Sequence, residues 1–177
     1  MIVVSNTSPL NYLILVDAVH SLPKLFGNIV IPSAVCDELS DALAPDPVRH
    51  WIRQKPDWLL VQEVMSSNGI ELNSLHRGER EAINLAVQLA ADLIILDERP
   101  ARKVAESCGL RVTGTLGILN FAGQRGLLNI SRVIARLKRT LFRATPVMYK
   151  WLFAFKLRHE SRLNQTQPPL VRVMGLC

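Results

Sequence analysis

The chain has 177 residues, of which 49% are hydrophobic and 20% charged, and it carries a formal net charge of +6. This composition is typical of one ordinary globular domain with a sizeable core and excludes a disordered chain. Three cysteines without a CxxC spacing, no signal-peptide pattern and no long uncharged apolar segment exclude a disulfide-rich or membrane-spanning protein and predict a cytoplasmic one.

Strands and helices alternate in the first half of the chain. The β-branched run at residues 1–5 predicts a strand, and turn residues 6–9 lead into a helix over residues 10–19, with Pro9 in its first turn. A second strand is predicted at residues 28–31, followed by a helix over residues 33–43. Residues 44–56 carry three prolines, which predicts a loop or a broken helix, and residues 59–64 resemble an edge strand.

The second half repeats this alternation around one strongly apolar strand. A helix is predicted over residues 79–91, and the apolar run at residues 93–96 is typical of a parallel strand covered on both faces. A helix opened by Pro100 and ended by Gly109 follows, then a strand at residues 110–113 and a helix at residues 118–124. Five short strands separated by helices predict an α/β fold with a parallel sheet and right-handed crossovers.

Positive charge is concentrated after residue 129. Residues 130–177 hold ten Lys and Arg residues against one acidic residue, whereas residues 1–129 hold eleven against fourteen. Two basic amphipathic helices are predicted, at residues 131–143 and 145–159, and the first leaves Arg132, Arg136 and Arg139 largely outside its apolar face. These arginines suit nucleic acid, with a merely solvated helix face as the alternative.

The second basic helix is rich in bulky residues, which favours packing on the sheet or on a second subunit, with a stacking platform for bases as the alternative. Residues 1–160 are thus predicted to form a single domain that includes both basic helices. Residues 161–177 are polar and contain prolines before they turn apolar, which predicts a flexible tail.

Glu79 is an acidic residue in the middle of the apolar stripe of its predicted helix. A carboxylate facing a core is costly unless it is paired, protonated or bound to a cation. A structural ion pair with Arg77 or Arg102 is one explanation, and a bound cation is the other.

Polar oxygen-bearing side chains also follow the predicted strands. Asn6 follows the first strand, Glu38 lies on the second predicted helix, and Asp97 ends the apolar strand. In open α/β sheets ligands bind outside the carboxyl ends of the strands, so these side chains are predicted to meet Glu79 there. Oxygen ligands suit Mg²⁺ or Mn²⁺, and such an ion activates water for phosphodiester hydrolysis. The alternatives are a turn residue for Asn6, a solvated acid for Glu38 and a helix cap for Asp97.

The segments VVSNTSPL, IPSAVCDEL, HRGEREAINLA, LIILDE and GLRVTGTLGIL, taken together, resemble the PIN domain, in the branch similar to VapC-type toxins. The likeness runs from residue 2 to about residue 149. It implies a three-layer α/β/α sandwich around a short parallel sheet of about five strands, Mg²⁺-dependent ribonuclease activity and a homodimer. It also implies a small antitoxin protein as a partner.

Carried over to this chain, the acidic quartet of the family falls on Asn6, Glu38, Glu79 and Asp97. Asn6 departs from the family pattern, which commonly has Asp there, and the lost charge predicts weaker metal binding. Three hydroxyl-bearing residues could donate to phosphate or to a metal-bound water, namely Thr7, Ser8 and Thr115.

Two functions from different classes follow. The first is a metal-dependent endoribonuclease of the VapC type, using Mg²⁺ or Mn²⁺. The second is a catalytically weakened or inactive PIN scaffold that binds nucleic acid or a partner protein through its basic C-terminal helices. A nucleotide-binding dehydrogenase is disfavoured, because no GxGxxG follows a predicted strand.

Overall fold

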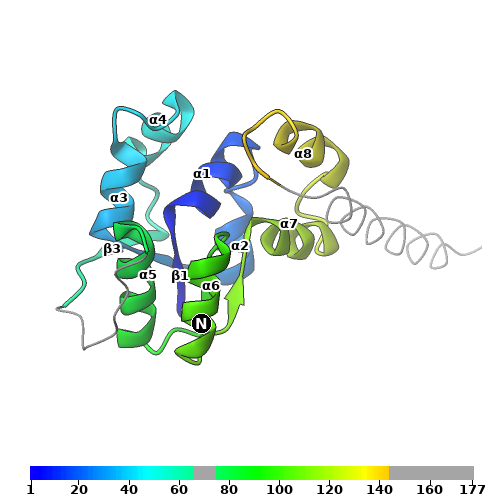
Figure 1. Ribbon diagram of the computed structural model, residues 1–177. Helices are drawn as coiled ribbons and strands as arrows, with labels where there is room; N and C mark the ends of the chain where they lie inside the picture. The colour runs from blue at the N-terminus through cyan, green and yellow to red at the C-terminus, as the bar shows by residue number, and fades with distance from the viewer. Residues whose placement is uncertain (66–74, 144–177) are drawn as a thin grey trace, which may run out of the picture.

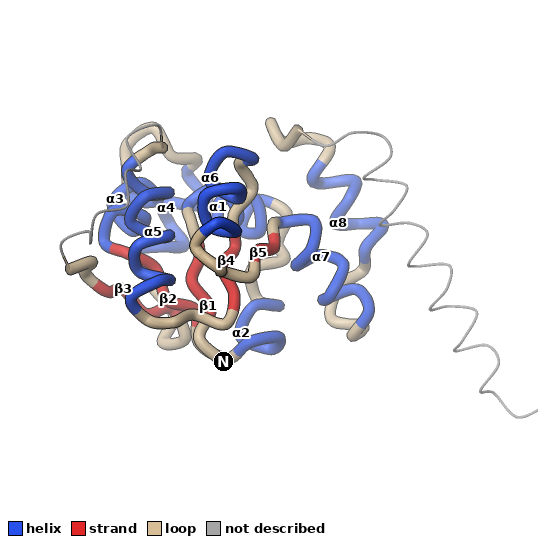
Figure 2. Tube along the Cα trace, turned by 60° about the horizontal axis from the view of Figure 1, so that its bottom comes forward, coloured by secondary structure: helices blue, strands red, loops and turns tan. Residues whose placement is uncertain are grey.

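The protein is built on a parallel sheet with helices on both faces. The computed structural model describes residues 1–65 and 75–143, which Figures 1 and 2 show in two orientations. The sheet has five strands in the order β3-β2-β1-β4-β5, and all four neighbouring pairs are parallel. The strands are β1 Val3–Ser5, β2 Ile29–Pro32, β3 Leu59–Gln62, β4 Leu93–Ile95 and β5 Val112–Thr113. The predicted α/β/α fold with five short parallel strands is confirmed, with β3 at an edge.

Eight helices lie in the described part of the chain. They are α1 Thr7–Leu15, α2 Ser21–Phe26, α3 Ser33–Ser40, α4 Asp46–Gln54, α5 Arg77–Gln88, α6 Arg99–Ser107, α7 Thr115–Gln124 and α8 Ile130–Leu137. None of the helices in these ranges is long and apolar enough to cross a membrane.

Strand side chains alternate between two apolar cores, one on each face of the sheet. Val3, Ile29 and Ile95 belong to the core that includes residues of α1, α2, α3, α4, α7 and α8. Val4 and Ile94 belong to the core under α5 and α6. A parallel strand must be apolar on both faces to be covered in this way, which explains the unbroken hydrophobic runs of the sequence.

The first predicted helix is wrong at both of its ends. It was expected over residues 10–19, but α1 begins at Thr7, because Asn6 caps it and Pro9 fits within its first turn. It ends at Leu15, and Asp17 then takes a left-handed backbone conformation with φ of 60°. A separate helix, α2, follows.

The proline-containing segment at residues 44–56 is a helix, α4, and not a loop or a broken helix. Pro47 occupies the first turn, where a missing backbone N–H costs nothing, while Pro45 and Pro56 lie outside the helix. The other predicted strands, and the predicted helices before residue 125, are present with ends shifted by no more than three residues. Gly109 has φ of 78°, as expected for the residue after a helix end.

The first basic helix is shorter than predicted. It was expected over residues 131–143, but α8 ends at Leu137, and the Thr140 hydroxyl donates to the Leu137 carbonyl just beyond that end. The chain then turns back toward α1, where Phe142 contacts Tyr12. The second predicted basic helix, at residues 145–159, and the predicted tail at residues 161–177 lie outside the described residues.

Candidate active site at the carboxyl ends of the strands

Asn6 joins the carboxyl end of β1 to α1. Its backbone N–H donates to the Ile95 carbonyl at 3.1 Å, which continues the β1–β4 pairing past the strands. Its side-chain oxygen accepts a hydrogen bond from the backbone N–H of Thr7 and caps α1. The residue is only 3% exposed. Asn6 therefore has a local capping role, and the sheet also fixes it at the edge where a ligand site was predicted.

Glu38 bridges two helices from its place on α3. One carboxylate oxygen, Oε2, accepts a hydrogen bond from the Thr7 hydroxyl at the start of α1. The other, Oε1, accepts from the backbone N–H of Gly78 at 2.9 Å, in the first turn of α5. A Cβ at Gly78 would lie 2.5 Å from Oε2, so only glycine admits this approach. The alternative of a solvated boundary acid is wrong, because both oxygens of Glu38 are engaged within the protein.

Glu79 lies in the first turn of α5 and is 6% exposed, as its place on the apolar stripe predicted. Its Oε2 accepts a hydrogen bond from the backbone N–H of His76 at 2.9 Å. Burial is the main cause that raises the pKa of Glu79 above its ordinary value, and the charges of Glu98 and Glu38 raise it further. The bond from His76 acts in the opposite direction.

The alternative explanation for Glu79, a structural ion pair with Arg77 or Arg102, is wrong. Arg77 instead pairs with Glu81 at 2.9 Å and with Asp37 at 3.6 Å. The Arg102 guanidinium donates to the Leu96 carbonyl at 2.8 Å. Glu79 therefore has no salt bridge within the described part of the chain, and its buried carboxylate keeps a desolvation cost that a bound cation would relieve.

Asp97 follows β4 and is held by the first residue of α7. Thr115 donates to it twice, from its backbone N–H at 2.8 Å and from its hydroxyl at 2.6 Å. A Cβ at Gly114 would lie 2.7 Å from Asp97 Oδ1, so this neighbour too has to be glycine. Burial raises the pKa of Asp97, against the two bonds from Thr115, and Glu98 raises it further. The alternative role of Asp97, as a cap for the helix opened by Pro100, is wrong, because the N-cap of that helix, α6, is Glu98.

Glu98 is a site residue that the sequence analysis missed. Its Oε1 accepts a hydrogen bond from the Ser8 hydroxyl of α1. Its Oε2 is buried and accepts no hydrogen bond from the residues that the structure describes. A buried carboxylate oxygen without a donor is costly, so it marks a position where a cation or a water would be stabilising. The sequence signal was present, because Glu98 is the second acid at the end of the apolar strand.

Four carboxylates lie within electrostatic reach of one another, and they are called the carboxylate row below: Glu38, Glu79, Glu98 and Asp97. The charge of Glu98 raises the pKa of both Asp97 and Glu79, and the charge of Glu38 also raises that of Glu79. Among residues 1–65 and 75–143, no three His, Cys, Asp or Glu side chains lie close enough to hold one ion directly. Mg²⁺ usually keeps several waters and is bound through one or two carboxylates and substrate phosphates. Asp97 and Glu98, with its free oxygen, fit that requirement.

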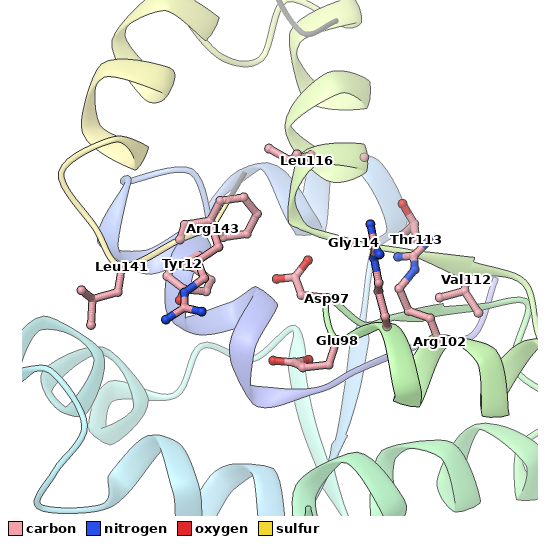
Figure 3. Close-up of a pocket in the computed structure, with 13 residues that line it drawn as sticks. Tyr12, Asp97, Glu98, Arg102, Val112, Thr113, Gly114, Leu116, Leu141 and Arg143 are labelled. Carbon is pink, nitrogen blue, oxygen red and sulfur yellow. The ribbon is translucent and has the colours of Figure 1, made fainter. Parts of the chain in front are cut away.

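A cavity of about 620 Å³ opens over Asp97 and Glu98. Figure 3 shows Asp97 between Tyr12 and Arg143 on one side and Gly114 and Arg102 on the other. Burial raises the pKa of the Tyr12 hydroxyl, Asp97 and Glu98 raise it further, and Arg143 lowers it. The phenol therefore lies within the electrostatic reach of the carboxylates.

The arginines assigned to nucleic acid are in different environments. Arg136 on α8 pairs with Asp17 at 2.8 Å and donates to the Val16 carbonyl at 3.1 Å, so it holds α8 to the end of α1. Arg132 and Arg139 are more exposed, and Arg139 lies just past the end of α8. The three hydroxyl residues predicted to meet phosphate donate to carboxylates in this structure. Thr7 donates to Glu38, Ser8 to Glu98 and Thr115 to Asp97.

Comparison with known proteins gave one family match. The family model DUF3368, described as a PIN domain, matches residues 2–154. The search of curated proteins found no match. The search of solved structures found none either.

Proposed function

The chain belongs to the PIN domain family, whose members are generally nucleases, and we propose that it is a metal-dependent endoribonuclease of the VapC type. The substrate would be RNA, and the ion Mg²⁺ or Mn²⁺. We further propose that it works in the cytoplasm as a homodimer, and as the toxin of a pair that a small antitoxin protein neutralises.

The observation that carries the nuclease proposal is the environment of the Glu98 carboxylate beside Asp97. One buried oxygen of Glu98 has no donor among residues 1–65 and 75–143, and the negative charge of Glu98 raises the pKa of the adjacent Asp97. Two neighbouring carboxylates at the end of a parallel strand suit a hard divalent ion. Such an ion would activate water and stabilise the charge that develops on a phosphodiester.

The residues of the chain have distinct roles in this proposal. Asp97 and Glu98 would hold the ion, and Thr115 fixes the orientation of Asp97 through two hydrogen bonds. Glu38 and Glu79 stand further along the row, where they would bind a second ion or orient water. The N-termini of α1, α5 and α7 all reach the row, through Thr7, Gly78 and Thr115. Their positive dipole ends stabilise the carboxylates and would attract the phosphate of RNA.

A catalytically weakened binding module is the second candidate, and Asn6 favours it. The amide oxygen of Asn6 already accepts the hydrogen bond that caps α1, and it brings no negative charge to the row. In that case RNA or a partner protein would bind through Arg132, Arg139 and the rest of the basic C-terminal region without turnover. Such binding would weaken steeply with salt.

Metal binding tests the nuclease proposal without relying on activity. Mn²⁺ at 100 times its dissociation constant should stabilise the protein by about 2.7 kcal/mol, seen as a higher midpoint of thermal unfolding. Glu98→Gln should lose most of this shift, whereas Glu106→Gln, an exposed acid on the same helix, should keep it. Equal shifts in both variants would contradict a metal site at Glu98.

Cleavage separates the two candidates. The purified protein with Mn²⁺ should cut a labelled single-stranded RNA, and Asp97→Asn should abolish cutting. RNA that stays intact with either metal, together with salt-sensitive binding that Asp97→Asn leaves unchanged, would favour the binding module. Neutralising Arg132, Arg136 and Arg139 together should then remove that binding.

A further inference from the structure

The cavity over Asp97 is built from parts of the chain that are far apart in sequence. Its wall includes Tyr12 of α1, the segment that follows Asp97, the turn between β5 and α7, and residues 141–143 beyond α8. Its volume of about 620 Å³ falls in the range of pockets that take a small organic ligand. One nucleotide is a ligand of that size, and the carboxylates of Asp97 and Glu98 line the cavity (Figure 3).

Two aromatic side chains form part of the cavity wall. The rings of Tyr12 and Phe142 are 4.8 Å apart between centroids and 82° apart in plane. In such an edge-to-face pair one ring offers its edge, so the partner covers neither face of that ring. Both rings are only partly buried where they pack against the apolar core, which leaves part of each for the cavity wall. An aromatic face beside an open cavity is what stacks an unpaired base in proteins that bind single-stranded nucleic acid.

The charges around the cavity match a phosphate next to a metal site. Arg143 is exposed and lies next to Tyr12 on one side of Asp97 (Figure 3). Arg102 lies on the opposite side, held in place by its bond to the Leu96 carbonyl. A nucleotide carries a planar base and an anionic phosphate, and this cavity offers an aromatic face and cations within one space.

We propose that this cavity holds one unpaired nucleotide of the RNA, with its base against Tyr12 and Phe142 and its phosphate toward Arg143. The inference rests on the proposed nuclease function and assigns the residues that would hold the substrate beside the carboxylates. A base in a duplex is stacked on both faces and paired at its edge, so it cannot enter the cavity without being pulled out of the helix. Tyr12, Phe142 and Arg143 are therefore the residues that would select an unpaired nucleotide at this position.

A fluorescent base analogue tests the proposal without cleavage. A ten-nucleotide single-stranded RNA with 2-aminopurine at successive positions is titrated with the full-length protein in the presence of EDTA. At one position the emission should fall on binding, as stacking on an aromatic ring requires. Phe142→Leu should remove that fall and weaken binding about ten-fold. Phe142→Tyr should restore both, which separates loss of stacking from loss of fold.

A matched control comes from α7. Phe121 is 45% exposed and does not line the cavity, so Phe121→Leu should leave both binding and emission unchanged. Arg143→Gln should reduce the slope of log affinity against log salt by about one, as the loss of a single phosphate contact does. A hairpin duplex that binds as tightly as the single strand would overturn the selection.

The outcomes of these experiments test the nucleotide cavity separately from the proposed nuclease function. Protein that cleaves RNA, but never changes the emission of 2-aminopurine, overturns the nucleotide cavity and leaves the nuclease proposal standing. Protein that shows the emission change and its loss in Phe142→Leu, but never cleaves, supports the cavity and overturns the nuclease proposal.

Discussion

Thr115 holds both carboxylate oxygens of Asp97, one through its backbone N–H and the other through its hydroxyl, at 2.8 and 2.6 Å. Hydrogen bonds of this kind normally lower the pKa of an acid. Burial and the neighbouring Glu98 outweigh them here, because the pKa of Asp97 is raised. Asp97 is therefore well oriented but, without a cation, electrostatically unfavourable in its charged form.

Asp97→Asn should stabilise the metal-free protein at neutral pH while it abolishes cleavage. A raised folded-state pKa means that the folded protein holds its proton longer than the unfolded chain does. Stability therefore falls as the pH rises from the unfolded value, about 3.9, through the raised folded value. The amide cannot ionise, so the variant should lose this part of the pH dependence.

Thermal unfolding in EDTA between pH 4 and pH 8 measures this effect. We expect the midpoint of Asp97→Asn to exceed that of the wild type by about 2–4 °C at pH 7, the shift that roughly 1 kcal/mol produces in a chain of this size. The difference should shrink toward pH 4. Because Glu79 also has a raised pKa from burial, a smaller slope of the same sign should remain in the variant. An unchanged slope would mean that Asp97 is not desolvated.

Gly78→Ala should impair the site with little loss of stability. The added Cβ would lie 2.5 Å from Glu38 Oε2, and the flexible end of that side chain must move away from the start of α5. Alanine favours the helix by up to about 1 kcal/mol, which offsets the lost contact. We expect Mn²⁺ affinity or cleavage to fall about 10-fold to 100-fold, as for other residues that orient metal ligands.

Gly27→Ala is the matched contrast to that substitution. Gly27 has no heavy atom near its missing Cβ, but its φ of 78° strains any other residue. Here the unfolding free energy should fall by about 1–3 kcal/mol with cleavage unchanged in the folded protein. If both glycine variants behave alike, the contact between Gly78 and Glu38 does not position the site.

Much of the fold was predictable from the sequence because its strands are buried on both faces. An unbroken apolar run such as residues 93–96 has few alternatives, and the alternating helices then dictate a parallel sheet. The helix α4 was missed because prolines were treated as breakers, although Pro47 lies in a first turn that accepts it. The number of prolines alone cannot distinguish a loop from a helix. The position of each proline relative to the first turn distinguishes them.

Part of the candidate site was also predictable from the sequence pattern. The helical periodicity correctly put Glu79 on a buried face. Glu98 was missed because it lies beyond the end of β4 at Ile95 and before the first residue of α6, where no strand or helix periodicity indicates the direction of a side chain. The return of Phe142 to Tyr12 depends on α8 ending at Leu137, and no local signal in the amphipathic pattern marks that end.

The pair between Arg136 and Asp17 should contribute to the docking of α8. A double-mutant cycle with Arg136→Ala and Asp17→Asn should give a coupling of about 0.2–1 kcal/mol, since Asp17 is largely exposed. Arg136 lowers the pKa of Asp17, so this stabilisation is present above the ordinary pKa of an aspartate. It should disappear as the pH falls through the lowered value, which urea unfolding at pH 7 and pH 3 would measure.

Asn6→Asp should raise metal affinity and cleavage. Aspartate can still accept the hydrogen bond from the Thr7 N–H, so the cap of α1 is kept. At a residue only 3% exposed, the new charge adds to the repulsion along the carboxylate row. The metal-free protein should therefore become less stable, and Mn²⁺ should restore more stability than it does in the wild type.

Asn129→Asp is the control for that substitution, because Asn129 also caps a helix. Its side-chain oxygen accepts a hydrogen bond from the Arg132 N–H at 3.1 Å. Its negative charge at the start of α8 should stabilise the protein slightly, by about 0.3–1 kcal/mol, without altering cleavage. Thermal unfolding with and without Mn²⁺, together with initial cleavage rates, compares the two variants. A rise in cleavage for Asn6→Asp alone means that the site is assembled but lacks one charge. If the rate stays at the wild-type level while Mn²⁺ binds more tightly, the amide at residue 6 does not limit turnover, and the arrangement of Glu38 and Glu79 becomes the limiting feature.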